Sequence, residues 1–456
     1  MHFLGIDLGS TTIKVGVLNP QQGTVSAVRT QPFPGPLPGK AAAYFEIDAD
    51  AVGHAVMALI DEVRPAAADC RGVVVSSQMG GVLLTDAAGA PVTNYLSWRD
   101  QRALEPYPGK QHSYFDELRQ RTRPDDWDRI GRELKPGSAA TLLFWLAKTG
   151  AVPANAAMAM SLGDFVVARL CRAPAAAEPT LALGLLDLTA GTWHTDWFGR
   201  LGFGSLAWPV LKDFSQPVGT VQMGSARVPC YPAVGDQQAA LLGAELAEGE
   251  LSINISTGSQ VASLVSHWQP GDYQTRPFFD GRFINTITHL PAGRSLSALV
   301  DLLCELPLAE GYTVRDPWAT IVRAVERTAD SQLDVNLAFF ASAVGDRGHV
   351  ANLRLEDLTV GSLFRAALRS MADNYAVAAA RLSADANWTR LALSGGLPQR
   401  FAVLRELLAE RFGCPSRMVD TPEETLHGLL RLAQRIAAGG STAAEGHSPG
   451  SHARRQ

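Results

Sequence analysis

The stretch Asp7-Leu8-Gly9-Ser10-Thr11-Thr12-Ile13-Lys14 joins two apolar segments at the start of the chain and is the part of the sequence most informative about its fold. An apolar run at 3–8 leads into it, and β-branched residues continue at strand spacing as far as Leu18. A second turn at 19–23 precedes a third predicted strand over 24–30. The chain therefore opens with an antiparallel meander, which differs from the βαβ unit of dinucleotide-binding folds.

The turn that follows Asp7 has the composition of a phosphate-binding loop. Gly9 lets the backbone turn closely, and the N–H and hydroxyl groups of Ser10, Thr11 and Thr12 can surround an anion. A carboxylate beside phosphate needs a cation between them, and Mg²⁺ held by one carboxylate and substrate phosphates fits Asp7. A plain hairpin with a polar tip explains this segment equally well when it is taken alone.

Length and composition indicate two large domains and no nucleic-acid partner. The 456 residues exceed the usual size of a single domain, and a hydrophobic content of 46% excludes a disordered chain. The 40 Lys and Arg residues stand against 45 Asp and Glu residues, for a net charge of -5. The chain therefore lacks the excess of basic residues that is typical of proteins that bind the phosphate backbone of nucleic acids.

Cysteine usage and the start of the chain predict a cytoplasmic protein without a membrane partner. The five cysteines lie far apart and are odd in number, which favours free thiols over disulfides or a thiolate metal site. The N-terminus has no basic segment before its apolar run, so we expect no signal peptide. The longest uncharged stretch, 251–271, is rich in Ser, Asn, Thr and Gln and does not suit a bilayer. Neither a zinc motif such as HExxH nor a GxxxxGK[ST] loop occurs.

The opening layout returns in the second half of the chain. A predicted strand at 251–256 leads into Thr257-Gly258-Ser259 and a further strand at 260–265. Two domains that each open with such a hairpin are able to face one another across a cleft. The expected division is a first domain at 1–243 with a helical insertion at about 106–200, a second domain at 244–436, and a disordered low-complexity tail at 437–456.

Three other turns carry groups suited to bind substrates. Asp236 stands at the start of a predicted helix, where it is either an N-cap or a base that orients a substrate hydroxyl. Gly395 and Gly396 leave room for a flat ring between a strand and a helix. The segments 76–80 and 98–100 combine hydrogen-bonding side chains with an aromatic ring, as a sugar site requires. Each segment alone also has an ordinary interpretation as a loop or cap.

Taken in order, these segments resemble the FGGY family of carbohydrate kinases. They are DLGSTTIK at 7–14, SSQMGG at 76–81, SWRDQR at 97–102, GDQQAAL at 235–241, NISTGSQVA at 254–262 and LSGGLPQR at 393–400. The resemblance extends from about residue 3 to about residue 435 and is strongest toward the sedoheptulokinase branch. The segments 254–257, 141–148 and 164–171 indicate that branch.

The resemblance implies an α/β, actin-like ATPase fold in which two ribonuclease-H-like domains flank an interdomain cleft and close over ATP and a sugar. It implies that Asp7 holds Mg²⁺ through water and that Asp236 is the catalytic base. The implied nucleotide-binding residues are Gly9, Ser10, Thr11, Thr12, Lys14, Thr257, Gly258, Gly395 and Gly396. The implied sugar-binding residues are Gln78, Met79, Trp98, Asp100, Asp236 and Gln237. A homodimer follows by analogy.

The expected activity is transfer of the γ-phosphate of ATP to a ketose, with sedoheptulose and its 7-phosphate placed first. A kinase for another ketose or polyol, xylulose-type, is the alternative. Two departures bear on this choice: Gly80 stands where ketose kinases commonly have histidine, and the segment 423–430 replaces a motif that usually ends in Gly-Ala-Ala. A nucleotide-switched binding protein and a sugar sensor without turnover also stay open.

Overall fold

The opening hairpin consists of β1 (His2–Leu8) and β2 (Thr12–Asn19), and β3 (Thr24–Pro32) pairs antiparallel with β2. The structure is a computed structural model that describes residues 1–383, 385, 387–419, 421 and 423–444. Its register places Asp7 opposite Lys14 and Gly5 opposite Gly16. The predicted antiparallel meander is confirmed.

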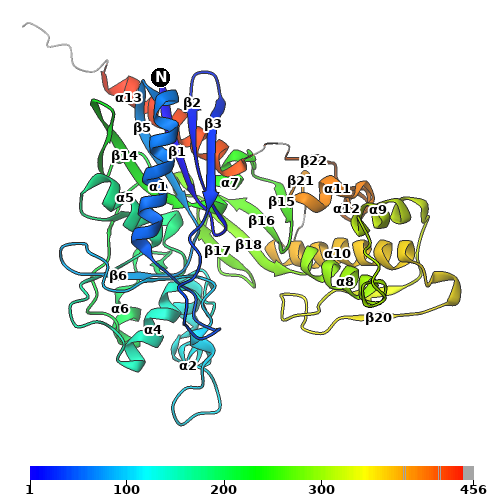
Figure 1. Cartoon of the computed structure of the whole chain (residues 1–456). Helices are drawn as coiled ribbons and strands as arrows, with labels where there is room; N and C mark the ends of the chain where they lie inside the picture. The colour runs from blue at the N-terminus through cyan, green and yellow to red at the C-terminus, as the bar shows by residue number, and fades with distance from the viewer. Residues whose placement is uncertain (384, 386, 420, 422, 445–456) are drawn as a thin grey trace, which may run out of the picture. The chain divides into compact units, whose positions relative to one another are not determined.

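The described chain forms two units, each built around a six-stranded mixed sheet (Figure 1). The first unit comprises Met1–Glu245, Pro277–Phe279 and the C-terminal segment from Thr421. The second comprises Leu246–Arg276 and the segment from Asp280 to Val419. Each unit therefore has its own sheet and its own hydrophobic core, as the expected α/β fold requires.

The sheet of the first unit has the order β13-β14-β5-β1-β2-β3. Besides β1, β2 and β3, its strands are β5 (Cys70–Ser77), β13 (Gly219–Met223) and β14 (Ala226–Gly235). β1 and β14 both run parallel to β5, and their apolar side chains are buried. Parallel neighbours end at the same edge, so the carboxyl ends of β1, β5 and β14 lie side by side.

Helix α1 (Ala49–Val63) packs on β2 and β3 through a stripe of apolar residues at helical spacing. Val52, Val56 and Leu59 are buried, and burial of each such side chain contributes roughly 1.5–3 kcal/mol. Asp48 caps the helix by accepting hydrogen bonds from the N–H groups of Asp50 and Ala51 at 2.9 and 3.2 Å.

Helix α13 (Glu424–Ala444) packs on β1, β2 and β5 and on α7 (Asp236–Gly243). Leu426 of α13 lies next to Gly16 of β2, at 3.4 Å from where a Cβ atom would stand, which is an ordinary contact distance. We expected this part of the chain in the second domain, but its contacts place it in the first unit. The helix also continues into the segment expected to be a tail, whose residues 445–456 lie outside the described residues.

The region of the expected helical insertion has its own hydrophobic core. Its helices are α2 (Tyr114–Arg121), α3 (Pro124–Arg129), α4 (Ala139–Thr149) and α6 (Thr195–Leu201). α5 (Leu162–Cys171) instead packs on β14 and β5 of the main sheet. The first unit also contains short strand pairs, several of whose strands lie outside 106–200: β4 (Glu46–Ile47) with β7 (Tyr95–Leu96), β6 (Leu83–Thr85) with β8 (Met158–Met160), β9 (Ala176–Ala177) with β12 (Val210–Leu211), and β10 (Leu186–Asp187) with β11 (Thr192–Trp193).

The sheet of the second unit has the order β17-β18-β16-β15-β21-β22. Its strands are β15 (Glu250–Ile255), β16 (Ser259–Val265), β17 (Gln274–Pro277), β18 (Phe283–Leu290), β21 (Arg390–Ser394) and β22 (Ser416–Met418). Its helices are α8 (Gly293–Ala309), α9 (Pro317–Arg327), α10 (Val360–Leu382), α11 (Gly396–Arg400) and α12 (Ala402–Phe412). β19 (Asp334–Asn336) and β20 (His349–Ala351) form a separate pair. The hairpin of β15 and β16 confirms the predicted return of the opening layout.

Two helices are shorter than the helical pattern of the sequence predicts. That pattern covers 237–248, where α7 ends at Gly243, and 399–412, where Phe401 separates α11 from α12. Phe401 has extended backbone angles and is buried, so packing overrides the helical periodicity there. Within the described ranges, none of the helices combines the length and apolar character that a bilayer span demands.

Candidate active site

The register of the first sheet brings three of the predicted segments to one edge. Asp7 of β1 is level with Ser76 of β5, which in turn is level with Val234 of β14. Gln78 and Asp236 each lie two residues beyond that row, past the ends of their strands. In open α/β sheets, ligands bind at this carboxyl edge. The structure thus assembles residues that are separated by more than two hundred positions in the sequence.

Asp7 is buried at the end of β1 and accepts a hydrogen bond from the Ser76 hydroxyl at 3.0 Å. Burial raises the pKa of the Asp7 carboxyl to about 6, an effect opposed by the Ser76 hydrogen bond and by the nearby Lys14 ammonium. A carboxylate in this position is poorly solvated, and a bound cation would stabilise its charged form. One buried carboxylate suits Mg²⁺ only where substrate phosphates and water supply the other ligands.

Lys14 of β2 forms an ion pair with Glu423, which lies just before α13. Glu423 has a φ of 61°, in the left-handed region that residues with side chains rarely adopt. The residues of the loop between β1 and β2 are accessible to different degrees, with Ser10 and Thr12 partly buried and Thr11 exposed. The loop can therefore offer hydroxyl groups and a cation to phosphate.

Gln78 connects the loop between β1 and β2 with the aromatic residue of the expected sugar site. Its side-chain amide donates to the Gly9 carbonyl at 3.3 Å, and its carbonyl oxygen accepts from the Trp98 indole at 3.1 Å. Trp98 is 40% exposed, so its ring offers a face to a ligand. Gly80 adopts a φ of 77°, in the left-handed region that favours glycine.

Asp100, which was expected to face the sugar, is fully buried. Its two carboxylate oxygens accept hydrogen bonds at 2.7 to 2.9 Å from the Arg102 backbone and guanidinium and from the Phe45 N–H. Arg102 also pairs with the buried Glu46 at 2.8 Å. Ion pairs of this kind hold a loop in one conformation, and the contacts of Asp100 support the Trp98 segment instead of facing a ligand.

Asp236 is the first residue of α7, where the helix dipole favours an anion. Its Oδ1 atom accepts a hydrogen bond from the Gln237 N–H at 2.7 Å. Its charge also reaches Tyr95, whose pKa is raised mainly by burial and further by the Asp236 carboxylate. Met79 lies against the residue before Asp236, since a Cβ atom at Gly235 would be 2.7 Å from the Met79 sulfur.

The remaining predicted nucleotide residues lie together in the second unit. Asn254 of β15 is level with Ser394 of β21, and its amide donates to that hydroxyl at 2.8 Å. Gly395 follows with a φ of 90°, and a Cβ atom there would be 2.3 Å from the Ile255 carbonyl oxygen. This close approach places Gly395 and Gly396 beside the turn that contains Thr257 and Gly258. That turn is exposed, and a Cβ atom at Gly258 would meet no neighbouring atom.

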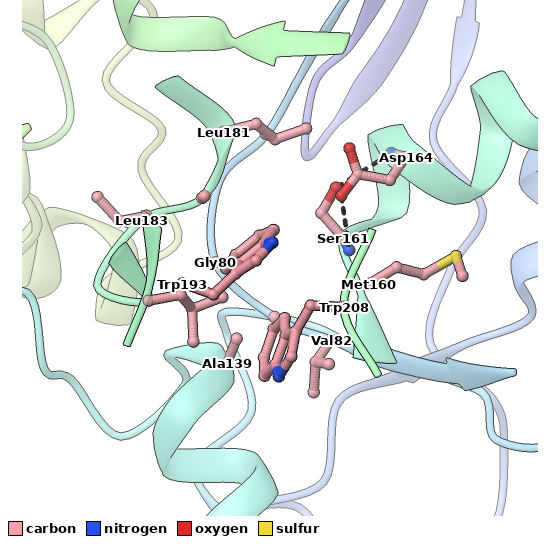
Figure 2. Close-up of a pocket in the computed structure, with 13 residues that line it drawn as sticks. Gly80, Val82, Ala139, Met160, Ser161, Asp164, Leu181, Leu183, Trp193 and Trp208 are labelled. Atoms are coloured by element: carbon pink, nitrogen blue, oxygen red, sulfur yellow. Dashed lines mark hydrogen bonds between the residues drawn. The ribbon is translucent and has the colours of Figure 1, made fainter. Parts of the chain in front are cut away.

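Gly80 and Gly81 are among the residues that line a small cavity of about 20 Å³ in the first unit (Figure 2). The indole rings of Trp193 and Trp208 line it, with centroids 4.9 Å apart, and so does Asp164. Burial raises the pKa of Asp164 to about 7, and the carboxyl accepts a hydrogen bond from the Ser161 N–H at 3.2 Å. This volume accommodates a water molecule and is too small for a sugar.

Several supporting residues were missed in the sequence. Thr180 and Glu423 contact the segments named above, and Glu178 and Gln238 contact Thr180. The motif GDQQAAL contains Gln238, so its position beside Asp236 was a usable signal. Glu178 and Thr180 lie in a stretch without clear periodicity, and Glu423 belongs to the segment 423–430, where only the folded chain shows its contact with Lys14.

Comparison with protein families gives a match over the first unit. A model of the N-terminal domain of the FGGY family of carbohydrate kinases matches residues 2–243, which is more than half of the chain. Comparison with curated protein sequences gives no match.

Solved structures with this fold include several sugar kinases. Gluconate kinase from Lactobacillus acidophilus aligns with a TM-score of 0.83 and 16% identity, over 96% of this chain and 89% of that chain. Xylulose kinase from Rhodospirillum rubrum aligns with a TM-score of 0.81 and 20% identity, over 96% and 90%. Glycerol kinase from Plasmodium falciparum with ADP aligns with a TM-score of 0.81 and 16% identity, over 96% and 89%. The α/β fold with two ribonuclease-H-like units is thus confirmed, and the chain belongs to the FGGY family of carbohydrate kinases, which are ATP-dependent sugar kinases.

Proposed function

We propose that this kinase phosphorylates a ketose, with Asp236 orienting the sugar hydroxyl and accepting its proton. The observation that carries the proposal is the register of β1, β5 and β14, which gathers Asp7, Gln78 and Asp236 at one sheet edge. Sedoheptulose, giving the 7-phosphate, is placed first because of the segments similar to that branch. Xylulose is the second candidate, because xylulose kinases are among the similar structures.

Asp7 is proposed to hold Mg²⁺ through water, and the ion would neutralise phosphate charge when bound. The loop residues Gly9, Ser10, Thr11 and Thr12 and the ammonium of Lys14 are proposed to bind the phosphates of ATP. In the second unit we propose that Thr257 and Gly258 also bind phosphate and that Gly395 and Gly396 border the adenine.

The proposed role of Asp236 requires orientation more than basicity. Phosphoryl transfer passes through a loose transition state, so an ionised aspartate is basic enough to accept the hydroxyl proton. The hydrogen bond from the Gln237 N–H fixes one carboxylate oxygen. Gln78, Met79 and Gln237 are proposed to bind the sugar, and the exposed Trp98 ring to cover its C–H face.

The test is a coupled assay of ADP release with sedoheptulose, xylulose, ribulose, gluconate and glycerol. We expect release to require a ketose, and Asp236→Asn to lower kcat by at least about 100-fold while ATP binding stays within twofold. Asp301→Asn, at an exposed position of α8, is the matched control. Undiminished turnover in the Asp236 variant would refute the proposal.

The same assay separates the alternatives. A rate of ADP release that is the same with and without each sugar would indicate a nucleotide-switched binding protein. Sugar binding without ADP release would indicate a sensor. The homodimer stays a prediction, which light scattering on the purified chain can check.

A further inference from the structure

The residue before Asp236 is tied to a segment 55 positions earlier in the chain. The N–H of Gly235 donates to the Thr180 hydroxyl oxygen at 3.0 Å. The hydroxyl donates its own hydrogen to the Glu178 carboxylate, which also accepts from the Thr180 N–H at 2.7 Å. Thr180 and its neighbours Pro179 and Leu181 form the short 3₁₀ helix η3.

This chain of hydrogen bonds is shielded from water. Glu178 is 4% exposed and Thr180 1%, and Gly235 is buried as well. No solvent can replace a lost partner at such a site, so removal of one group leaves the next without its hydrogen bond. The Thr180 hydroxyl is central because it acts as donor and acceptor at once.

A second contact holds the other side of Asp236. The side-chain amide of Gln238 donates to the Thr180 carbonyl at 3.2 Å. Gly235 makes this close packing possible, because a Cβ atom there would lie 2.9 Å from the Thr180 carbonyl oxygen and 2.3 Å from the Gln238 side chain. Thr180 thus binds the residue before Asp236 through its hydroxyl and the second residue after it through its carbonyl.

We propose that Thr180, held in turn by Glu178, is a positioning residue that fixes the direction of the Asp236 carboxylate. The inference rests on the proposed role of Asp236 as the base. A displacement of about 1 Å at a reacting group can reduce a rate by about 100-fold, so support of this kind acts on kcat. Neither Thr180 nor Glu178 needs to touch the sugar or the nucleotide for this effect.

The test compares Thr180→Val, which has nearly the same shape without the hydroxyl, with Thr180→Ser, which keeps the hydroxyl. We expect Thr180→Val to lower kcat by 10- to 100-fold, on the scale that a small displacement produces, and to leave KM for ATP and for the sugar nearly unchanged. We expect Thr180→Ser to retain kcat within about threefold, because the hydroxyl supplies both hydrogen bonds. Wild-type kcat in Thr180→Val, or equal losses in both variants, would overturn the inference.

A double variant separates positioning from a general structural role. If Thr180 acts through Asp236, Thr180→Val should cause little further loss of kcat in the Asp236→Asn background. A further tenfold loss there would overturn the inference. Should Thr180→Val not fold, Glu178→Met, which removes the acceptor of both Thr180 hydrogen bonds, replaces it in both measurements. An unchanged kcat in Glu178→Met would likewise overturn the inference.

The two proposals fail in different ways. Wild-type kcat in Asp236→Asn contradicts the role of Asp236 itself. An inactive Asp236→Asn together with a fully active Thr180→Val contradicts only the positioning role of Thr180.

Discussion

The Asp7 carboxylate lies directly across from Ser76 on the neighbouring parallel strand and accepts the hydrogen bond of its hydroxyl at 3.0 Å. Both side chains are buried, so this bond replaces only part of the water that an exposed carboxylate would have. The protein without ligands therefore carries a charge that it stabilises poorly. Carboxyl groups with a pKa shifted by burial are common at functional sites.

We predict that Asp7→Asn stabilises the free protein at high pH while it abolishes activity. Burial raises the pKa of Asp7 from 3.8 to about 6, so the folded chain binds this proton more tightly than the unfolded chain does. The contribution to stability is complete below pH 3.8 and is lost as the pH rises through about 6. The difference between the two pKa values corresponds to about 3 kcal/mol of unfolding free energy at high pH. Asn at position 7 does not ionise, so the variant keeps this stability as the pH rises.

Urea titrations at pH 4 and pH 8 measure this effect. The free energies of unfolding of wild type and variant should agree at pH 4, and the variant should be more stable by up to about 3 kcal/mol at pH 8. Asp301→Asn serves as the exposed control and should behave like wild type at both pH values. Equal stability of Asp7→Asn and wild type at pH 8 would contradict the assigned environment of Asp7.

Trp98 and Asp100 are two positions apart, but we expect their substitution by alanine to affect different properties, sugar binding for Trp98 and stability for Asp100. Trp98→Ala removes an exposed ring, and we expect a higher KM for the sugar with little change in Tm. Asp100→Ala leaves the buried Arg102 guanidinium without one of its partners, which costs about 3–5 kcal/mol. Thermal melts and sugar titrations on both variants give the comparison. A normal Tm in Asp100→Ala, with only the sugar KM raised, would instead favour direct contact with the sugar.

Gly428 should be essential to the packing of α13 on α7. A Cβ atom at Gly428 would lie 1.8 Å from the Ala239 carbonyl oxygen, so Gly428→Ala forces the helices apart. We expect a loss of at least about 1–3 kcal/mol in unfolding free energy. Gly439→Ala in the same helix meets no neighbouring atom and should stabilise by up to about 1 kcal/mol. Equal effects of the two substitutions would refute the packing.

Local patterns predicted the elements and the motifs better than they predicted which elements are neighbours. The hairpin at Gly9 and the turn at Gly395 follow from residue type and short-range spacing, and both were expected. The parallel pairing of β1 with β5 and the place of α13 depend on packing between distant segments, which no periodicity encodes. The polar character of Asp100 suggested a ligand, although its nearest cation, Arg102, was only two residues away.

The same limit explains why the contacts around Asp236 were only partly foreseen. Asp236 and Gln237 were evident from a motif at a predicted strand–helix junction. Thr180 comes from a stretch whose elements are two or three residues long, too short for a hydrophobic period to show. Its hydroxyl acquires a role only when β14 and η3 meet in the folded unit.

Lys14 should determine the affinity for ATP more than the stability of the fold. Its ion pair with Glu423 is partly exposed, so Lys14→Met should change the unfolding free energy by less than about 1 kcal/mol. A hydrogen bond from an ammonium to phosphate contributes about 1.5–3 kcal/mol, and its loss should raise KM for ATP by about tenfold or more. The sugar KM, measured at saturating ATP, should stay nearly constant, and Lys110→Met at an exposed loop position should match wild type. An unchanged KM for ATP would mean that the Lys14 ammonium stays with Glu423 and does not bind the nucleotide.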